Sequence, residues 1–275
     1  MVWKALLKLV RWYLVAGHGQ SVEIQPIFEQ MIQYALAGMN IGRGGVVTES
    51  GEMAVIQYVA QLCSSIASNP IIFDVGANEG QYATQVLRII GDRGQIHCFE
   101  PSKMAFTQLH QRIGAQPNVI LHNIGLGEVE GIRTLYSGAP HSRLASLYHR
   151  RLDHYGIRMD DKEQVTIKTL DGLCGEIGVE NIHLLKLDVE GHELNVLQGA
   201  QRLIETEAIK LIQFEFGGCN IDSRTFFQDF FYLLNPHYTL HRVLRDGWVA
   251  LPAYREQYEV FLTTNFLAVS RSLKG

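Results

Sequence analysis

Cysteine is sparse in this sequence, and its distribution excludes a common class of metal site. The four cysteines lie far apart, and no CxxC pair or clustered Cys/His spacing brings zinc ligands together. We therefore expect reduced core thiols, a cytoplasmic location and no structural metal centre of this kind. The cysteines are Cys63, Cys98, Cys174 and Cys219.

Long apolar runs and a surplus of basic residues are also missing. No uninterrupted apolar stretch reaches the roughly 18 residues of a membrane-spanning helix, so we expect none. The net charge is −4, which gives no overall basic field of the kind that attracts nucleic acid. With 275 residues, 47% of them hydrophobic, the chain can form one large domain, or one domain with an appendage.

The N-terminal segment, residues 1–16, reads MVWKALLKLVRWYLVA and predicts an amphipathic helix with a basic face. Lys4, Lys8 and Arg11 interrupt its apolar residues, whereas a signal peptide needs a longer charge-free core and a small-residue cleavage site. Two roles stay open for this helix. It attaches loosely to an anionic membrane surface, or it caps the domain or serves as a dimer partner. We favour the second role, capping or dimerisation.

The pattern of apolar residues changes near residue 69 and predicts two parts. Residues 1–68 are expected to form a helical extension, because helical periodicity continues on both sides of a glycine-rich stretch. Residues 69–275 alternate β-rich runs with helical segments, which predicts an α/β domain with a mainly parallel sheet and helices on both faces. The last two runs lack a helix between them, so the sheet should end antiparallel. The runs are IIFDV, QIHCFE, NVILHNI, IHLLKLDV, KLIQFEF, YTLHRVL and FLTTNFLAV.

The stretch FDVGANEGQY, residues 73–82, has the composition of a ligand-binding turn between a strand and a helix. We expect Gly76 and Gly80 to let a ligand approach the backbone, next to the N-terminal amides of the helix. The spacing is GxxxG, not the GxGxxG of a dinucleotide site. Asp74, directly before the loop, would repel a phosphate and attract a cationic ligand.

Glu100 ends the next β-rich run, about 20 residues beyond the loop, where a carboxylate can accept both hydroxyls of a ribose. A glycine loop with a ribose acid indicates a nucleoside-containing cofactor. The competing interpretation is an ordinary strand, turn and helix followed by an exposed glutamate.

Ionisable residues crowd the end of the run HLLKLDVEGHE, where an acceptor should meet the cofactor. Glu215 lies in the neighbouring apolar run IQFEF. In a doubly wound sheet these strand ends are neighbours, so Asp188 and Glu215 are expected on one rim. The other candidates at this end are Lys186, Glu190, His192 and Glu193.

Several blocks in order resemble the FkbM family of S-adenosylmethionine-dependent methyltransferases, over roughly residues 70–271. The resemblance implies a class I methyltransferase fold, with a seven-stranded sheet whose last strand is antiparallel, and O-methylation of a hydroxyl, commonly on a sugar or a polyketide-like product. It places Asp74, Gly76, Asn78 and Gly80 around the methionine part of the cofactor, Glu100 on the ribose and Asn123 at the adenine. The blocks are FDVGANEGQYA, FEPS, NVILHNIGLGEVEG, ASLY, VTIKTLD, LLKLDVEGHELNVLQGA and IQFEF.

Two mechanisms compete for the carboxylates. Asp188 and Glu215 act as a general base and its orienting partner, with Lys186 and His192 as further catalytic candidates, or oxygen ligands hold a divalent cation against the acceptor. We favour the metal-free base, because no tight oxygen-ligand motif is present. Glu193 is expected to begin the following helix, where its charge complements the helix dipole.

The segment before the fourth strand, SGAPHSRLASLYHRRLDHYGIRMDD, is rich in arginine and histidine. It either forms the acceptor site for a phosphorylated, nucleotide-linked, lipid-linked or acidic saccharide, or it is a solvated helix face. The function predicted is O-methylation of a saccharide or glycolipid precursor. The alternatives are a nicotinamide-dependent oxidoreductase and a catalytically silent module that binds a nucleoside cofactor. The acceptor's identity and the oligomeric state stay open.

Overall fold

The computed structural model describes Lys8, Arg11–Gly17, Gly19 and residues 21–65, 69–138 and 144–274. The predicted amphipathic helix over residues 1–16 lies mostly outside these residues, and only its end is seen, as the helical turn η1 (Arg11–Gly17). None of the described helices is long and apolar enough to cross a membrane. Attachment of residues 1–16 to a membrane surface therefore stays a prediction.

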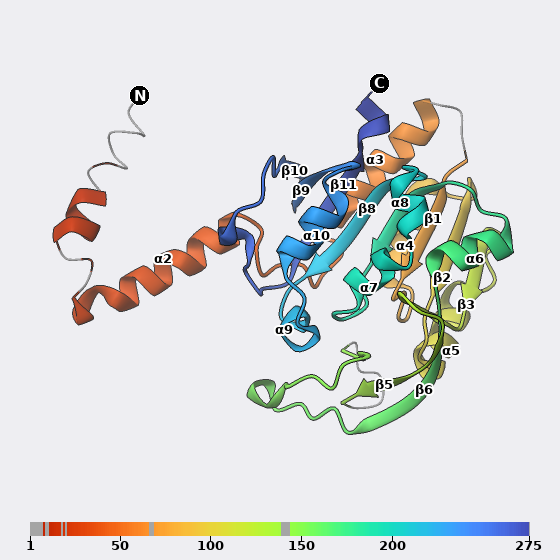
Figure 1. Cartoon of the computed structure of the whole chain (residues 1–275), viewed down its shortest axis with the longest axis horizontal. Coiled ribbons are helices and arrows are strands. Elements are labelled where there is room, and N and C mark those ends of the chain that lie inside the picture. The colour runs from red at the N-terminus through yellow and green to blue at the C-terminus, as the bar shows by residue number, and fades with distance from the viewer. Residues whose placement is uncertain are drawn as a thin grey trace.

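The core of the molecule is a sheet of eight strands in the order β10-β9-β11-β8-β7-β1-β2-β3 (Figure 1). The strands from β3 to β8 along this order run parallel to one another, whereas β11 is antiparallel to both β8 and β9. This is the arrangement predicted from the sequence, including the antiparallel last strand. The strands are β1 (Ile71–Val75), β2 (Gln95–Phe99), β3 (Val119–His122), β7 (Ile182–Leu187), β8 (Ile209–Phe216), β9 (Tyr238–Leu244), β10 (Gly247–Ala250) and β11 (Thr264–Ser270).

The sheet has one strand more than the seven expected. Strand β10 pairs with β9 in an antiparallel hairpin, in which Gly247 lies opposite Leu244. The connection contains Arg245 and Asp246 and leads into a glycine, which is a common signature of a tight hairpin turn. The additional strand extends the edge of the sheet farthest from β3 and leaves the order of the other seven unchanged.

Helices cover both faces of the sheet, because alternate strand residues point to opposite sides. On one face Ile72 packs with α3, α4 and α5, and on the other Phe73 packs with the layer that contains α6, α7, α8 and α10. Phe214 on β8 stacks on Phe230 of α10 with ring centroids 4.8 Å apart. The helices are α3 (Glu52–Ser65), α4 (Gln81–Ile90), α5 (Lys103–Ile113), α6 (Leu170–Ile177), α7 (Glu193–Gln198), α8 (Gln201–Glu205), α9 (Cys219–Ser223) and α10 (Phe227–Leu234).

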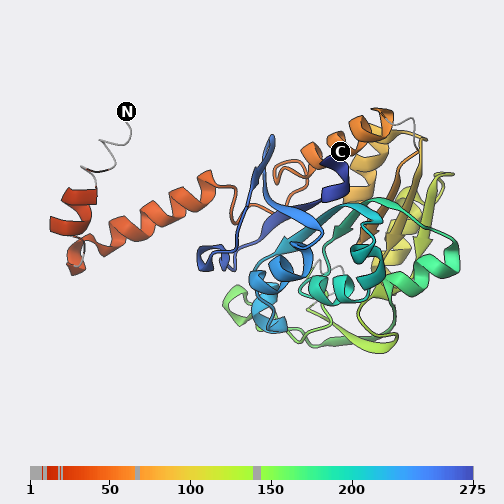
Figure 2. The same ribbon diagram turned by 45° about the horizontal axis from the view of Figure 1, so that its top comes forward.

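The two helices of the expected N-terminal extension behave differently. Helix α3 buries Val55, Ile56 and Val59 against the sheet, so it is part of the core although it precedes residue 69. Helix α2 (Gln25–Gly38) has no buried residue and projects from the body in both views (Figures 1 and 2). A domain boundary at residues 68 and 69 stays a prediction, and the packing of α3 favours an earlier division, between α2 and α3.

A second, smaller sheet with the order β4-β6-β5 lies beside the carboxyl ends of the main strands (Figure 1). It consists of β4 (Gly125–Leu126), β5 (Gly131–Ser137) and β6 (Asp161–Lys168), and the basic segment joins β5 to β6. His141 and Arg143 of that segment lie outside the described residues. From Leu144 onward the segment contains one short helical turn, η3 (Asp153–Tyr155), so it is not a regular helix face.

Candidate active site

One cavity of about 910 Å³ opens at the carboxyl ends of β1, β2, β7 and β8. The loop after β1 and the end of β2 form one part of its wall, the acidic ends of β7 and β8 form another, and the β5–β6 segment closes a third side. Of the residues predicted from the sequence, the cavity brings together Gly76, Asn78, Glu100, Lys186, Asp188, His192 and Glu215. Asp74, Gly80 and Asn123 do not line it.

The glycine loop is shaped by the packing of protein against protein. Gly76 has a φ of +82°, and a Cβ atom there would lie 1.8 Å from the carbonyl oxygen of Asp188. Asp188 N also donates to the carbonyl of Val75 at 3.0 Å, so the ends of β1 and β7 are in direct contact. Gly80 has a φ of +84°, and a Cβ atom there would lie 2.8 Å from Leu109 Cδ1. Strand and helix packing and the positive φ values thus account for both glycines, and their role in making room for a ligand stays a prediction.

Glu100 organises the part of the cavity next to this loop. Its Oε2 accepts from the backbone N–H of Asn78 at 2.9 Å, and its Oε1 accepts from that of Ser102 at 2.8 Å. Burial raises the pKa of Glu100 to about 7, although both backbone hydrogen bonds oppose the shift. Asn78 has a φ of +48°, a left-handed conformation that presents its N–H to the carboxylate. Glu100 therefore links the loop after β1 to the end of β2.

Asn123 supports this arrangement from outside the cavity. Its Nδ2 donates to the carbonyl oxygens of Glu100 at 2.9 Å and Pro101 at 3.1 Å. The side chain therefore braces the turn after β2, and the structure does not place it at the cavity wall where we expected it to meet an adenine. Gly125 and Leu126 of β4 line the cavity a few residues later.

Lys186 lies between two carboxylates at the base of the cavity. Its Nζ is 3.1 Å from Asp188 Oδ2 and 3.5 Å from Oδ1 of Asp74, whose side chain is fully buried. Burial lowers the pKa of Lys186, but Asp188, Asp74 and Glu52 together raise it above its usual range. The ammonium also lies 5.1 Å from the ring centroid of Tyr82. Asp74 thus neutralises a buried lysine beneath the cavity, whereas we expected it to face a cationic ligand.

A polar network below Lys186 was not predicted from the sequence. Glu52, at the start of α3, accepts from Ser50 Oγ at 2.8 Å and from Gln213 Nε2 at 2.8 Å. Tyr82 OH donates to Gln213 Oε1 at 3.5 Å, which links the network to the ring under Lys186. Burial raises the pKa of Glu52 to about 7. No local sequence signal marks Glu52, because its partner lies more than 150 residues away.

Asp188 and Glu215 line the same cavity, as expected for the ends of neighbouring strands. Burial, with the charges of Asp188, Glu190 and Glu193, raises the pKa of Glu215 well above its usual range. Glu190 forms an ion pair with Arg150, which is also 3.7 Å from Asp222. Burial raises the pKa of Glu190 to about 8. At this end of the cavity, Asp188 lies next to a lysine, Glu190 is paired with an arginine, and Glu215 forms no ion pair with any of the described residues.

His192 is held by a chain of hydrogen bonds. Its Nδ1 is 3.0 Å from Tyr148 OH, which donates to Asn195 Oδ1 at 2.9 Å, and Asn195 Nδ2 donates to Glu128 at 2.5 Å. Because the carboxylate can only accept, the chain assigns the proton of His192 to Nδ1. Burial lowers the pKa of His192 to about 4, so the ring is neutral near pH 7. Tyr148 belongs to the block ASLY, whose functional side chain we did not recognise in the sequence.

Glu193 begins α7, as expected. Its carboxylate accepts from the backbone N–H groups of Val189 at 2.9 Å and Gly191 at 3.2 Å. It therefore shapes the loop that presents Glu190 and His192.

A family model described as the methyltransferase FkbM domain matches residues 74–238, which is more than half of the chain. The chain belongs to the FkbM methyltransferase family. This membership removes the nicotinamide oxidoreductase that the sequence left as an alternative. The matched range contains every predicted site residue, and it excludes α3 and the antiparallel strand β11.

Two curated relatives and one solved structure illustrate the similarity. The 2-O-methyltransferase NoeI of Sinorhizobium fredii is 26% identical over 145 residues, covering 50% of this chain and 59% of NoeI. The hexuronic acid methyltransferase AglP of Haloferax volcanii is 26% identical over 172 residues, covering 61% of this chain and 64% of AglP. The crystal structure of methyltransferase FkbM from Methylobacillus flagellatus KT aligns with a TM-score of 0.40 at 15% identity, covering 73% of this chain and 43% of that chain. The alignments thus span about 60% of the length of both curated relatives.

Within the residues that the structure describes, no group of three or more His, Cys, Asp or Glu side chains is arranged to hold a metal ion. Among the carboxylates of this FkbM site, Asp188 is engaged with Lys186, Glu190 with Arg150, and Glu100 and Glu193 with backbone amides. Whether a divalent cation takes part in the reaction stays a prediction, with the metal-free base favoured.

Proposed function

We propose that this FkbM-family chain transfers a methyl group from S-adenosylmethionine to a hydroxyl group of a saccharide or of a glycolipid precursor. The observation that carries the proposal is the single cavity that joins Glu100 and the loop after β1 to the carboxylates Asp188 and Glu215. The relatives named above, one a 2-O-methyltransferase and one a hexuronic acid methyltransferase, support a sugar hydroxyl as the acceptor.

The residues around the loop fit the proposed methyl donor. A cavity of about 910 Å³ is large enough for a nucleoside cofactor together with part of an acceptor. Glu100 would accept from the ribose hydroxyls while it keeps its hydrogen bond to Asn78, and the backbone of Gly76 and Ala77 would face the amino-acid part. The carboxylate of Asp188 favours a positive charge nearby. When bound, S-adenosylmethionine supplies a methyl group that is reactive toward an oxygen nucleophile.

At the acceptor end, we propose that Glu215 takes the proton of the hydroxyl. Its pKa is raised by burial and by neighbouring carboxylates, and a carboxylate with a raised pKa is a stronger base than an exposed one once it is ionised. Lys186 holds Asp188 at 3.1 Å, which fixes a carboxylate beside the acceptor. His192, with a neutral ring and its Nε2 as the unprotonated nitrogen, is the second candidate base.

Measuring transfer of labelled methyl groups tests the proposal. The purified protein is incubated with tritiated S-adenosylmethionine and a panel of saccharides and glycolipids, and the products are tested for methyl ethers. We expect label in a methyl ether of at least one saccharide. Binding of the methyl donor in calorimetry, without transfer to any hydroxyl of the panel, would instead favour a silent cofactor-binding module.

A further inference from the structure

We propose that the acceptor carries an anionic group, a carboxylate or a phosphate ester, which Arg151 and Arg224 bind at the rim of the cavity. The inference rests on the proposed function, because it concerns the acceptor of the same site. It assigns a charge to the acceptor and names the residues that select for that charge.

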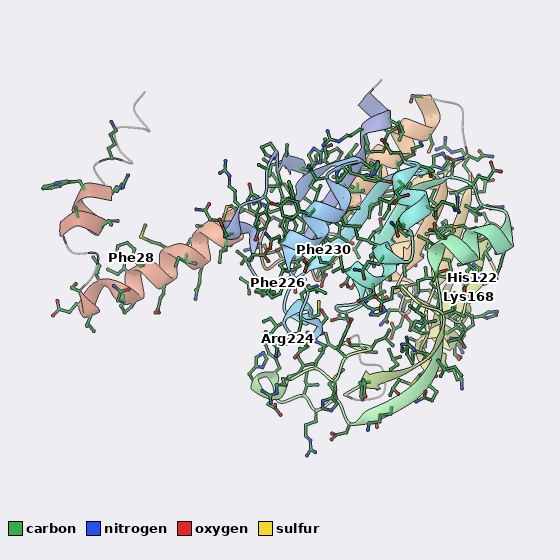
Figure 3. All side chains as sticks on the ribbon, in the orientation of Figure 1. Phe28, His122, Lys168, Arg224, Phe226 and Phe230 are labelled. Atoms are coloured by element: carbon green, nitrogen blue, oxygen red, sulfur yellow. The ribbon has the colours of Figure 1, made fainter. Side chains whose placement is uncertain are left out.

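The two arginines come from different parts of the chain and line the same cavity. Arg151 belongs to the β5–β6 segment, and Arg224 directly follows α9. The backbone N–H of Arg151 donates to Asp222 Oδ1 at 3.3 Å, which ties the segment to α9. Figure 3 shows Arg224 beside the green ribbon of that segment. Arg151 and Arg224 thus lie at the same part of the cavity, where the segment contacts Asp222 of α9.

The acidic residues of this wall are already engaged by a third arginine. Arg150 is almost fully buried and forms ion pairs with Glu190 and, at 3.7 Å, with Asp222. Among the described residues, no ion pair is formed by the guanidinium groups of Arg151 or Arg224, and both residues are exposed at the rim. Arg151 and Arg224 thus remain without an ionic partner among the described residues, whereas Arg150 already pairs with two carboxylates.

The backbone conformation of Arg224 is a second observation at this part of the cavity. Arg224 occupies the left-handed position at the end of α9, with a φ of +61°. Glycine is the preferred residue there, because a side chain disfavours this conformation. Arg224 thus places a long cationic side chain on the lining of the cavity at a position where glycine would be more stable.

The distribution of charge also fixes where an anionic acceptor would lie. Carboxylates at Asp188 and Glu215 repel an anionic group at the reacting end, whereas the planar guanidinium groups can bind carboxylate or phosphate oxygens in pairs. An acceptor held by its anionic group at the arginine wall would turn a neutral hydroxyl toward Glu215. The arrangement thus selects both the acceptor and the position that is methylated.

The test compares acceptors that differ only in charge. Sugar acids are paired with their neutral methyl esters, and sugar phosphates with the parent sugars, in the labelled-methyl assay. We expect the wild type to favour the anionic member of a pair by about tenfold or more in kcat/KM, the size of a charge-assisted hydrogen bond. Preference within the ester pairs identifies a carboxylate, and preference within the phosphate pairs identifies a phosphate.

Variants then assign the preference to these residues. Arg224→Gly and Arg151→Gln should each raise KM for the anionic acceptor by about tenfold, with little change for its neutral partner. The thermal midpoint of Arg224→Gly should be at least that of the wild type, because glycine relieves the left-handed strain. Arg158→Gln is the matched control: Arg158 lies in the same segment and pairs with Asp160 at 3.0 Å, but it does not line the cavity.

The outcomes separate the two proposals. The anionic acceptor would be overturned if the wild type had equal kcat/KM for charged and neutral acceptors. It would also be overturned if Arg224→Gly lowered kcat/KM equally for charged and neutral acceptors. In either case methyl transfer to a hydroxyl would stand. No transfer to any member of the panel would overturn the proposed function, and the inference with it. If Arg158→Gln raised KM for the anionic acceptor as much as Arg151→Gln does, the effect would be a general one of positive charge. That result would also overturn the assignment of Arg151 and Arg224 as the binding residues.

Discussion

Lys186 Nζ lies 3.5 Å from the fully buried carboxylate of Asp74, below the floor of the cavity. Asp74→Asn is therefore expected to act on folding stability, because it removes the charge that faces a buried ammonium. We expect a loss of about 3 kcal/mol in the free energy of unfolding, the lower end of the range for removing one partner of a buried ion pair. Urea unfolding measures it. Asp160→Asn, which alters an exposed pair with Arg158, is the control and should change little. An unaltered urea midpoint in Asp74→Asn would contradict the assigned ion pair.

Glu100 is expected to govern affinity for the methyl donor. Glu100→Ala should weaken binding of S-adenosylmethionine by roughly 1.5 to 3 kcal/mol, because it removes the ribose acceptor and frees the loop at Asn78. Asn123→Ala should weaken binding less, since Asn123 only braces the backbone of Glu100 and Pro101. Isothermal calorimetry measures both. Equal losses would mean that Glu100 acts through loop structure alone.

Glu215 should control the rate and its dependence on pH. Below the raised pKa the carboxyl group holds its proton, so the base form appears and the rate rises as pH increases through that pKa. Glu215→Gln should slow transfer by roughly 10²-fold to 10⁴-fold and abolish the rising limb, with binding of the methyl donor retained. Chelation should leave the wild type active if the base is metal-free. Loss of activity on chelation, restored by Mg²⁺, Mn²⁺ or Ca²⁺, would favour a metal site instead.

Glu52 should make folding stability depend on pH. Its pKa rises on folding from 4.5 to about 7, so the folded protein binds more protons than the unfolded chain between these values. The corresponding stability is present below the lower value and is lost as pH increases through the higher one. Glu52→Gln cannot ionise, so its free energy of unfolding should fall less steeply than that of the wild type between about pH 5 and pH 8. The free energy of unfolding is measured with urea at each pH. If it falls equally steeply with pH in the wild type and in Glu52→Gln, Glu52 does not titrate differently in the folded state.

Two truncations test the N-terminal helices. A chain that begins at residue 40 should fold, because α2 has no buried residue, whereas one that begins at residue 66 should not, because it lacks the buried side chains of α3. Circular dichroism during thermal unfolding distinguishes the two. If residues 1–16 attach to membranes, the full chain should sediment with anionic vesicles and the chain from residue 40 should not. Equal sedimentation would reject attachment through this segment.

The main sheet could be predicted because each of its long strands is a compact apolar run. Strand β10 was missed because it has four residues and lies partly exposed at the edge. The smaller sheet was missed because β4 has two residues and β6, DKEQVTIK, is largely polar. Neither β4 nor β6 has enough apolar residues for periodicity to distinguish it from a loop.

The site was predictable where a residue follows a strand and less so where it lies within one. Glu100 comes after the end of β2 and reaches the cavity as expected. Asp74 is inside β1, on the same side as Ile72, so it points toward the helical layer of α3 and α4. The alternation of side chains along β1 would have placed Asp74 on the face toward these helices. Its position next to the loop instead led us to expect it in the cavity. The contact between Glu52 and Gln213 could not be predicted, because it depends on how distant segments pack.

The close approach of Gly76 to the carbonyl of Asp188 distinguishes two parts of the cavity wall by how they are supported. It brings the ends of β1 and β7 into direct contact, so the loop after β1 lies next to the acidic end of β7. The β5–β6 segment instead reaches the cavity on a separate small sheet. If this segment forms the acceptor site, as we propose, insertions or substitutions there should change the acceptor while the contact between β1 and β7 is kept.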